Sequence, residues 1–112
     1  MKNTAQAPRP LEGLMVLELG TMITAPLAGM VLAHAGADVI KVEHPKGGDP
    51  FRSFRGGLYS PNFMAYNLGK RGVQLNLQNE AGRAAFRKLL ARADVLVENY
   101  RPGVLARLGF GA

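Results

Sequence analysis

The stretch Leu32–Arg52, LAHAGADVIKVEHPKGGDPFR, decides the fold of this chain. It predicts the end of a helix, a tight turn at Gly36, a buried strand over Asp38–Glu43 and a loop that opens at His44. In an open α/β sheet, ligands bind outside the carboxyl ends of the strands. We therefore expect binding or chemistry at the loop after this strand, with Glu43 and His44 as the first candidates.

A strand and a helix precede this stretch. Residues Leu14–Leu19 form a short apolar run that ends at Gly20, which is typical of a parallel strand covered on both faces. Ala25–Ala35 is helical in composition, with Thr24 placed to cap the helix and Pro26 suited to its first turn. Because this helix is apolar nearly all round, we expect it to be buried. Strand, helix and strand at this spacing predict a right-handed βαβ unit.

The chain beyond the central stretch predicts further elements. Pro45–Pro61 is rich in glycine, arginine and aromatic residues, and a loop of this length is usually functional or mobile. We expect a short helix at Asn62–Leu68, a basic turn at 69–72 and an alternating third strand at Val73–Leu77. The loop is therefore followed by a return to the sheet.

The last third predicts a helix capped by Asn79, a fourth strand at Asp94–Glu98 and a short helix that ends at Arg107. Together the elements predict an α/β domain over residues 11–112, with a mostly parallel sheet and flanking helices, after a flexible tail at 1–10. A chain that stops one turn after a strand and a helix also leads us to expect a truncated, incomplete domain from a longer protein.

The composition is that of an ordinary globular domain of 112 residues, with 47% hydrophobic and 20% charged residues. The net charge of +6 favours an anionic partner, although a soluble basic surface would also explain it. Cysteine is absent, which excludes disulfides and thiolate metal sites, and the two histidines stand too far apart in the sequence to suggest a metal site.

Targeting and membrane segments are not recognised. The first ten residues, MKNTAQAPRP, lack the apolar core of a signal peptide. The longest apolar stretch, Met22–Ala35, is interrupted by Pro26 and falls short of the roughly 20 residues that a membrane span needs. We therefore expect a cytoplasmic protein with no membrane partner.

Neither common phosphate-binding motif is present. A dinucleotide-binding domain needs G-x-G-x-x-G after its first strand, whereas this chain has GTMITA at Gly20–Ala25. A phosphate loop needs an earlier glycine and a following hydroxyl residue, both of which Gly69–Lys70 lacks. Since Glu43 stands where such proteins place a ribose-binding acid, a dinucleotide-binding oxidoreductase domain remains an alternative.

Phe51–Arg71 interleaves aromatic residues with arginines. It could stack bases of a nucleic acid or of one adenine nucleotide, or it could be a lid whose aromatic rings pack on the sheet. The moderate charge argues against a nucleic-acid partner. Glu18 and Glu98 could hold loops through backbone amides. Four basic residues fall beside predicted element ends, where a phosphorylated ligand would approach: Lys70, Arg71, Arg101 and Arg107.

Several segments, in order, resemble the amino-terminal part of the class III coenzyme A-transferases, a family that also contains the α-methylacyl-CoA racemases. The resemblance runs from Leu11 to the last residue. The matching segments are Leu11–Leu19, Ala25-Pro26, Gly36–Glu43, Gly48–Arg52, Asn67–Arg71 and Ala93–Gly103.

The resemblance implies a Rossmann-like domain that binds coenzyme A (CoA) or acyl-CoA as substrate, with no permanently bound cofactor. It also implies a homodimer whose two chains interlock like linked rings. In such transferases an aspartate attacks the acyl-CoA thioester, giving a mixed anhydride and CoA thiolate. The thiolate then forms an aspartyl-CoA thioester, and the acceptor carboxylic acid finally takes up the CoA. Racemisation of a 2-methylacyl-CoA is the alternative within the family.

By the family pattern the nucleophilic aspartate lies beyond Ala112, so the catalytic residue is unknown and we expect these 112 residues alone to be inactive. Among the implied CoA contacts, Arg107 is the expected phosphate ligand, because charge-assisted bonds to phosphate suit arginine. The contacts are Met22 and Ile23 along the pantetheine, His44 near the nucleotide, Leu75, Asn76 and Gln78 after the third strand, and Asn99, Tyr100 and Arg107 around the adenosine phosphates.

Overall fold

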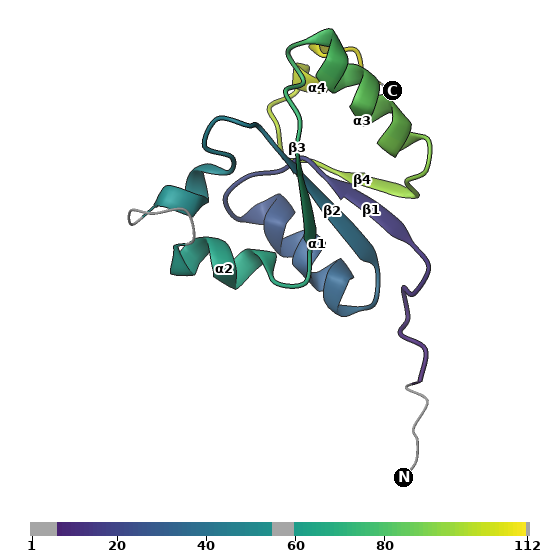
Figure 1. Cartoon of the computed structure of the whole chain (residues 1–112). Coiled ribbons are helices and arrows are strands. Elements are labelled where there is room, and N and C mark those ends of the chain that lie inside the picture. The colour runs from purple at the N-terminus through teal and green to yellow at the C-terminus, as the bar shows by residue number, and fades with distance from the viewer. Residues whose placement is uncertain (1–6, 55–59, 112) are drawn as a thin grey trace.

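The fold is a four-stranded, all-parallel sheet flanked by helices, seen in a computed structural model that describes residues 7–54 and 60–111 (Figure 1). This confirms the predicted α/β class. In chain order the elements are β1 (Met15–Glu18), α1 (Thr24–His34), β2 (Asp38–Glu43), the 3-10 helix η1 (Pro50–Ser53), α2 (Pro61–Asn67), β3 (Arg71–Gln74), α3 (Glu80–Leu90), β4 (Val95–Val97) and α4 (Val104–Arg107).

The strand order is β3-β2-β1-β4, so the chain reverses its direction of travel across the sheet at β1. From β1 it moves outward through β2 to β3, and then α3 carries it back to the other side of β1, where β4 pairs. The carboxyl ends of strands on either side of such a reversal diverge and leave a crevice. The topology therefore places the expected ligand position at the carboxyl ends of β1 and β4.

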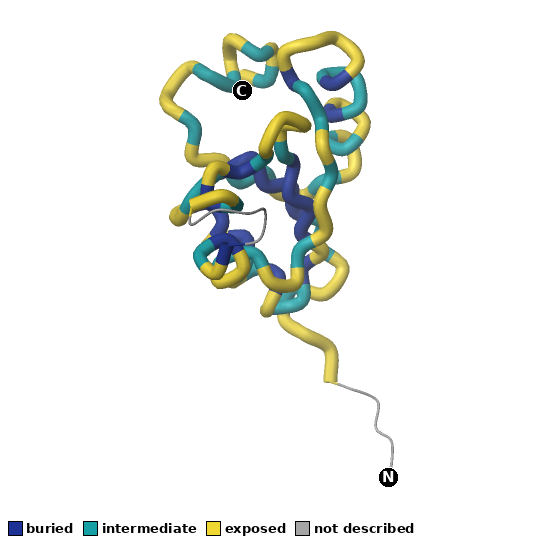
Figure 2. The backbone as a smooth tube through the Cα atoms, turned by 60° about the vertical axis from the view of Figure 1, so that its left-hand side comes forward, coloured by how far each residue is buried: buried dark blue, intermediate teal, exposed yellow. Residues whose placement is uncertain are grey.

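Helices cover both faces of the sheet (Figure 1). Successive side chains of a strand point to opposite faces of the sheet, so each strand contributes to the packing on both sides. On one face, Val16 and Val39 pack with Ala33 and Ala37 beside α1. The other face forms the larger core, whose buried members are Leu17, Leu19, Ile40, Val42, Leu77 and Phe86. The buried backbone runs through the middle of the molecule in Figure 2, with exposed segments around it.

Helix α1 differs from the sequence-based expectation in its cap and its burial. Ile23 is the N-cap residue and makes no side-chain cap bond, while Thr24 is already helical. The small residues of the helix are buried, but Leu27 is 40% and Val31 57% exposed. Within the described chain, the sheet and α2 cover one side of α1, so an apolar composition all round did not produce burial all round.

The glycine turn after α1 and the cap of α3 are confirmed. Gly36 has φ of +111°, a left-handed conformation that glycine adopts readily and that ends the helix before β2. Asn79 Oδ1 accepts a hydrogen bond of 2.8 Å from the Gly82 amide at the start of α3. These two local signals fix where β2 and α3 begin.

The described part of the predicted long loop contains regular structure. Asp49 caps η1 by accepting a hydrogen bond from the Phe51 amide, and Ser60 caps α2 in the same way through Phe63. The part of this loop at 55–59 lies outside the described residues. Strand β3 begins at Arg71, two residues before the predicted start, so the basic turn is partly strand.

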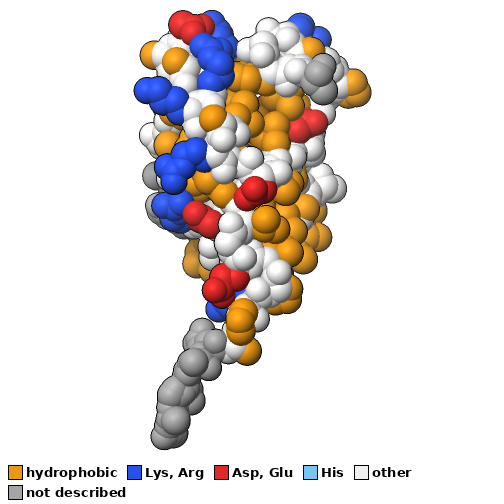
Figure 3. All heavy atoms as spheres, turned by 90° about the vertical axis from the view of Figure 1, so that its right-hand side faces the viewer, with side chains coloured by type: hydrophobic (Ala, Val, Ile, Leu, Met, Phe, Trp, Pro, Cys, Tyr) orange, Lys and Arg blue, Asp and Glu red, His pale blue; other side chains and the backbone are white. Residues whose placement is uncertain are grey.

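The face with α3 and the β4 edge is shown in Figure 3. Hydrophobic side chains run down its centre, and lysine and arginine side chains gather along one side. None of the helices in the described part of the chain combines the length and the apolar composition that crossing a bilayer requires.

Candidate functional site

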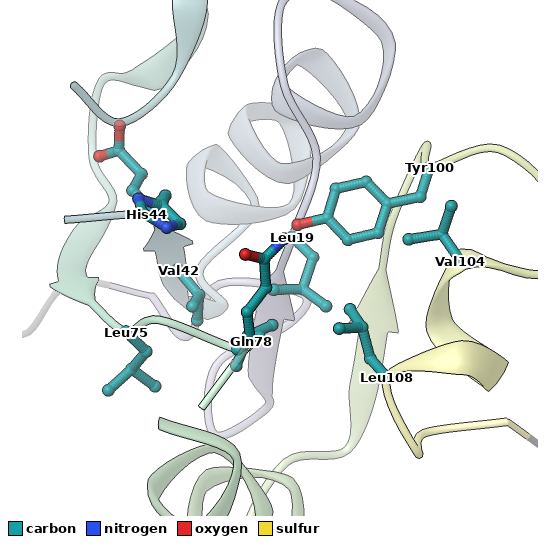
Figure 4. A pocket seen from close by; sticks show the side chains of 10 residues that line it. Leu19, Val42, His44, Leu75, Gln78, Tyr100, Val104 and Leu108 are labelled. Atoms are coloured by element: carbon teal, nitrogen blue, oxygen red, sulfur yellow. The ribbon is translucent and has the colours of Figure 1, made fainter. Parts of the chain in front are cut away.

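A cavity of about 210 Å³ lies at the carboxyl ends of the strands, where the topology predicts a ligand (Figure 4). Its walls come from the ends of β1 and β2, from the segments that follow β3 and β4, and from α4. The lining residues are Leu19, Val42, Glu43, His44, Leu75, Leu77, Gln78, Tyr100, Val104 and Leu108. The cavity is thus an apolar pocket with a few polar groups at its rim.

Four of the nine predicted ligand contacts line this cavity: His44, Leu75, Gln78 and Tyr100. In Figure 4, His44 and Tyr100 stand on opposite sides, with the Gln78 side chain between them in the view. These residues come from three segments that are far apart in sequence, and the parallel strand order brings the segments together. The remaining five predicted contacts, Met22, Ile23, Asn76, Asn99 and Arg107, lie outside the lining of the cavity.

Asn76 and Arg107 adjoin the cavity without lining it. Asn76 Oδ1 accepts a hydrogen bond of 2.9 Å from the Gln78 amide, and this bond shapes the turn that presents Gln78. Arg107 is exposed on α4, the helix that supplies Val104 and Leu108 to the cavity wall. Its guanidinium therefore lies outside the core, and Arg107 directly precedes Leu108, which lines the cavity.

The His44 ring is oriented by its own loop. Its Nδ1 accepts a hydrogen bond of 3.0 Å from the Lys46 amide. In the neutral ring the hydrogen therefore resides on Nε2, which makes that nitrogen a donor. His44 is exposed at the rim of the cavity, so it can donate to a polar group of a ligand.

Tyr100 supplies an amphipathic wall. Burial raises the pKa of its phenol, and the nearby Glu98 carboxylate raises it further. The hydroxyl therefore stays protonated at neutral pH and can donate a hydrogen bond. Glu98 Oε1 also accepts a hydrogen bond of 2.9 Å from the Tyr100 amide, which confirms that this acid holds its loop.

A second group of residues, beneath the β1–α1 loop, forms a buried ion network that the sequence analysis missed. Lys41 Nζ lies 2.7 Å from Glu18 Oε2 and 2.9 Å from Asp49 Oδ2, and it donates to the Gly20 carbonyl at 3.1 Å. Lys70 Nζ lies 2.5 Å from Glu18 Oε1. Two acids and two lysines thus neutralise each other inside the protein.

Lys70 is anchored as firmly as Lys41. Its ammonium donates to the Pro26 carbonyl at 2.8 Å and to Asn67 Oδ1 at 2.7 Å. Burial lowers the pKa of Lys70, against the opposing influence of the Glu18 carboxylate. Lys70 is therefore a structural cation and not the phosphate contact that its position in the sequence suggested. Glu18, for which the sequence left open a role in holding a loop amide, binds two lysines.

One signal in the sequence could have revealed this network. Lys41 interrupts the apolar strand Asp38–Glu43, and Glu18 ends the apolar run Leu14–Leu19. A charged residue in a strand that is buried on both faces requires a partner, because an unpaired buried charge is costly. The two charges could have been paired with each other once β1 and β2 were recognised as neighbours.

Glu43 is engaged within the protein. Its Oε2 accepts hydrogen bonds from the Asp49 amide at 2.7 Å and from Arg52 Nε at 2.8 Å, and its Oε1 lies 2.7 Å from Arg52 Nη2. Burial acts to raise the pKa of this carboxyl, but the Arg52 and Asp49 hydrogen bonds and the Arg52 and Lys41 charges lower it overall. Both oxygens serve the loop after β2, which weakens the ribose-binding alternative.

The aromatic residues of the loop pack mainly on each other. Phe51 stacks on Tyr66 with centroids 6.0 Å apart and meets Phe54 edge-on at 5.1 Å. Arg52 lies over the ring of Phe63 at 4.0 Å. Phe51 and Phe63 are buried, so these rings agree with the packing interpretation and not with a platform for bases.

Arg71, one of the four basic residues expected near a phosphorylated ligand, pairs with Asp38 at the amino end of β2, away from the cavity.

The three aspartates of the chain all have structural partners. Asp38 pairs with Arg71, Asp49 pairs with Lys41, and Asp94 Oδ2 accepts a hydrogen bond of 2.9 Å from the Met15 amide. None of them lines the cavity. Across the described ranges, no group of three or more acidic or histidine side chains is arranged to hold a metal ion.

Comparison with known proteins identifies the family to which this fold and cavity belong. Residues 11–112 match the family described as CoA-transferase family III, so the chain belongs to that family. It is 44% identical over 91% of its length to the succinyl-CoA–L-malate CoA-transferase beta subunit of Chloroflexus aurantiacus, covering 26% of that protein. It is 41% identical over 97% of its length to acetyl-CoA:oxalate CoA-transferase of Acetobacter aceti, covering 29% of it.

Comparison with solved structures supports the same fold. A CAIB/BAIF family protein from Brucella suis superposes with a TM-score of 0.87 at 38% identity, covering 95% of this chain and 30% of the other. The chain thus spans about a quarter of the length of the curated relatives that it matches. The Rossmann-like fold expected from the resemblance is confirmed.

Proposed function

We propose that this chain contributes the CoA-binding part of an enzyme that moves CoA from an acyl-CoA donor to a carboxylate acceptor. The observation that carries the proposal is the cavity at the chain reversal, where His44, Gln78 and Tyr100 ring an apolar pocket. Membership of CoA-transferase family III supports it, as do relatives whose names pair an acyl-CoA with a carboxylate acceptor.

The cavity suits one portion of CoA. Pockets for whole drug-sized ligands usually measure roughly 300–1,000 Å³, whereas this cavity measures about 210 Å³. In our proposal the nucleoside end enters here, with His44 and Tyr100 as donors to its polar groups and Arg107 on a phosphate. The pantetheine arm then runs along Met22 and Ile23 in the β1–α1 loop.

The chemistry we propose is covalent catalysis by a carboxylate. An aspartate oxygen attacks the thioester carbonyl of the donor, and the CoA thiolate leaves as the mixed anhydride forms. The thiolate then attacks the aspartyl carbonyl of the anhydride and releases the donor acid. The aspartyl-CoA thioester that results is attacked at its carbonyl by the acceptor carboxylate, which gives a second mixed anhydride and frees the CoA thiolate again. The thiolate then attacks the carbonyl of the acceptor in this anhydride, which gives the new acyl-CoA and regenerates the aspartate carboxylate.

The nucleophile in this scheme is not one of the aspartates of this chain. Asp38, Asp49 and Asp94 are each tied to a structural partner outside the cavity. We therefore assign the nucleophile to a residue outside these 112, and we predict that they do not transfer CoA by themselves. A racemase of the same family is the alternative, but the relatives described above are named as transferases.

We also propose that the active enzyme is an interlocked homodimer in the cytoplasm and holds no permanent cofactor. The exposed apolar side chains of α1, Leu27 and Val31, and of its N-cap residue, Ile23, are compatible with burial against further protein. An acyl-CoA and a carboxylic acid are the partners that the proposed reaction requires.

The test is the thermal unfolding midpoint of the chain with CoA, dephospho-CoA or NAD. A ligand that binds only the folded state stabilises it by about 2.7 kcal/mol at a concentration 100 times its Kd. We expect the midpoint to rise with CoA, to rise less with dephospho-CoA and to stay unchanged with NAD. A rise with NAD alone, or no response to CoA, would contradict the proposal.

A further inference from the structure

The loop between β1 and α1 contains a residue in an unfavourable backbone conformation. Met22 has φ of +65°, and it is the only residue other than glycine with positive φ in the described part of the chain. The left-handed region costs an ordinary residue roughly 1–2 kcal/mol. Such a conformation persists only where the surrounding structure imposes it. The contacts of the loop should therefore show what holds Met22 in place.

Asp49 holds the loop from one side. The Met22 amide donates a hydrogen bond of 3.1 Å to Asp49 Oδ1. The side chain of Asp49 is fully buried, and its other oxygen, Oδ2, lies 2.9 Å from Lys41 Nζ. A hydrogen bond to a buried, ion-paired carboxylate fixes the orientation of the Thr21–Met22 peptide plane, and in this orientation Met22 has the left-handed conformation.

Asn99 holds the same loop from the other side. Its Oδ1 accepts a hydrogen bond of 3.0 Å from the Thr21 amide, and its Nδ2 donates to the Thr21 carbonyl and to Thr24 Oγ1, both at 2.9 Å. Gly20 allows this approach, because a Cβ there would lie 2.9 Å from Asn99 Oδ1 and 2.0 Å from Ala25 Cβ. The loop is thus clamped between the segments that follow β2 and β4.

Asp49 is itself fixed by the strand end beside the cavity. Its amide donates to Glu43 Oε2 at 2.7 Å, and its Oδ1 also accepts a hydrogen bond of 2.9 Å from the Phe51 amide. Gly48 permits the tight turn, since it has φ of +66° and a Cβ there would lie 2.4 Å from Glu43 Oε2. The position of Met22 is therefore determined, through Asp49, by Glu43 at the cavity.

We propose that Asp49 is a positioning residue for the pantetheine arm of CoA, acting through the amide of Met22. The inference rests on the proposed function, in which Met22 and Ile23 receive that arm. Asp49 keeps the loop in its binding conformation before the ligand arrives, so that binding does not have to supply the cost of the left-handed turn. Without the carboxylate, Met22 relaxes to negative φ and the loop leaves that conformation.

A double-mutant cycle separates positioning from general stability. Asp49→Ala removes the acceptor of the Met22 amide, and Met22→Gly removes the penalty for positive φ. We expect Asp49→Ala to weaken CoA binding about tenfold in the otherwise unchanged chain and clearly less in the Met22→Gly background. An equal loss in both backgrounds would overturn the proposal.

Asp38→Ala is the matched control. It also removes an aspartate carboxylate, but from the amino end of β2, where Asp38 pairs with Arg71 at the surface, far from the loop that holds Asp49. This variant should bind CoA as the unchanged chain does. A loss of affinity equal to that of Asp49→Ala would mean that net charge, and not the Met22 contact, governs binding.

A spectroscopic measurement on the unchanged chain covers the case in which Asp49→Ala does not fold. Nuclear magnetic resonance should detect a scalar coupling across the hydrogen bond from the Met22 amide nitrogen to the Asp49 carboxyl carbon. The amide-to-α-proton coupling of Met22 should report positive φ both without and with CoA. Loss of either signal, or a change of φ on binding, would overturn the inference. A chain that shows both signals but does not bind CoA would instead contradict the proposed function.

Discussion

Lys41 Nζ lies 2.7 Å from Glu18 Oε2 in the interior of the protein, where the two side chains are 3% and 0% exposed. The pair joins β2 to β1 on the face that α1 covers, and Gly29 of α1 leaves room for it, since a Cβ there would lie 2.5 Å from Glu18 Oε1. Charges buried to this degree contribute little net stability when paired, but each is costly when its partner is removed.

Replacing Lys41 by methionine should therefore destabilise the fold strongly. Glu18 would retain Lys70, but Asp49 Oδ2 would lose the cation at 2.9 Å. We expect a loss of about 3–5 kcal/mol in the free energy of unfolding, measured by urea denaturation. Arg71→Met breaks the exposed pair with Asp38 and should change stability far less. If the two variants lost the same free energy of unfolding, the buried ion pairs would be no more important for stability than the exposed pair, contrary to this prediction.

Arg107→Ala tests the proposed phosphate contact. The side chain is exposed on α4, next to the cavity wall, so its loss should leave the fold intact. A charge-assisted hydrogen bond contributes about 1.5–3 kcal/mol, so CoA affinity should fall about tenfold or more. Dephospho-CoA affinity should change little if the contact is to the 3′-phosphate. Arg92→Ala, two residues beyond the carboxyl end of α3, is the control and should bind both ligands normally.

Val104→Phe tests whether the ligand occupies the cavity. Val104 lines the cavity from α4, and a phenyl ring there would fill part of the volume of about 210 Å³. We expect CoA binding, measured by titration calorimetry, to weaken at least tenfold while the ligand-free unfolding midpoint changes little. Ala84→Phe places the same ring in a separate groove along α3 and β3 and should leave binding unchanged. Normal binding by Val104→Phe would place the ligand elsewhere.

The pH dependence of stability should contain a contribution from Glu43. Its folded-state pKa lies below the usual value of 4.5, so the ionised carboxylate stabilises the fold above that pH. This contribution is lost as the pH falls through the lowered folded-state pKa. Urea denaturation from neutral pH to about pH 3 should therefore show a steeper loss in the unchanged chain than in Glu43→Gln. Glu12→Gln, an exposed acid near the amino end, should retain the steep loss.

Hydrophobic patterning predicted most of the fold. Asp38–Glu43 is a strand with the bounds expected from its apolar run, and Asn79 caps α3 as expected. The third strand was misplaced because the alternation at Val73–Leu77 has two causes. Val73 belongs to the strand, whereas Leu75 and Leu77 follow the end of the strand, where they pack in the core and line the cavity. Periodicity cannot distinguish these two uses of an apolar residue.

The candidate site was predictable only in outline. The rule that ligands bind at strand carboxyl ends located His44, which follows β2 directly, whereas Tyr100 was expected only from the family resemblance. The fixing of Met22 by Asp49 was not predictable, because 27 residues separate them and the contact depends on the return of the loop after β2. Long-range polar contacts of this kind leave no periodic trace in the sequence.

The buried pair of Glu18 and Lys41 also bears on how the strands find their alignment. The two residues stand directly opposite each other in the parallel ladder of β1 and β2. Sliding one strand by a single residue would turn its side chains to the other face and leave both charges without partners in an apolar layer. Apolar neighbours such as Val16 and Leu17 would tolerate that slip far better. The ion pair thus acts against misaligned sheets, a contribution to folding fidelity that the stability of the native state alone would not reveal.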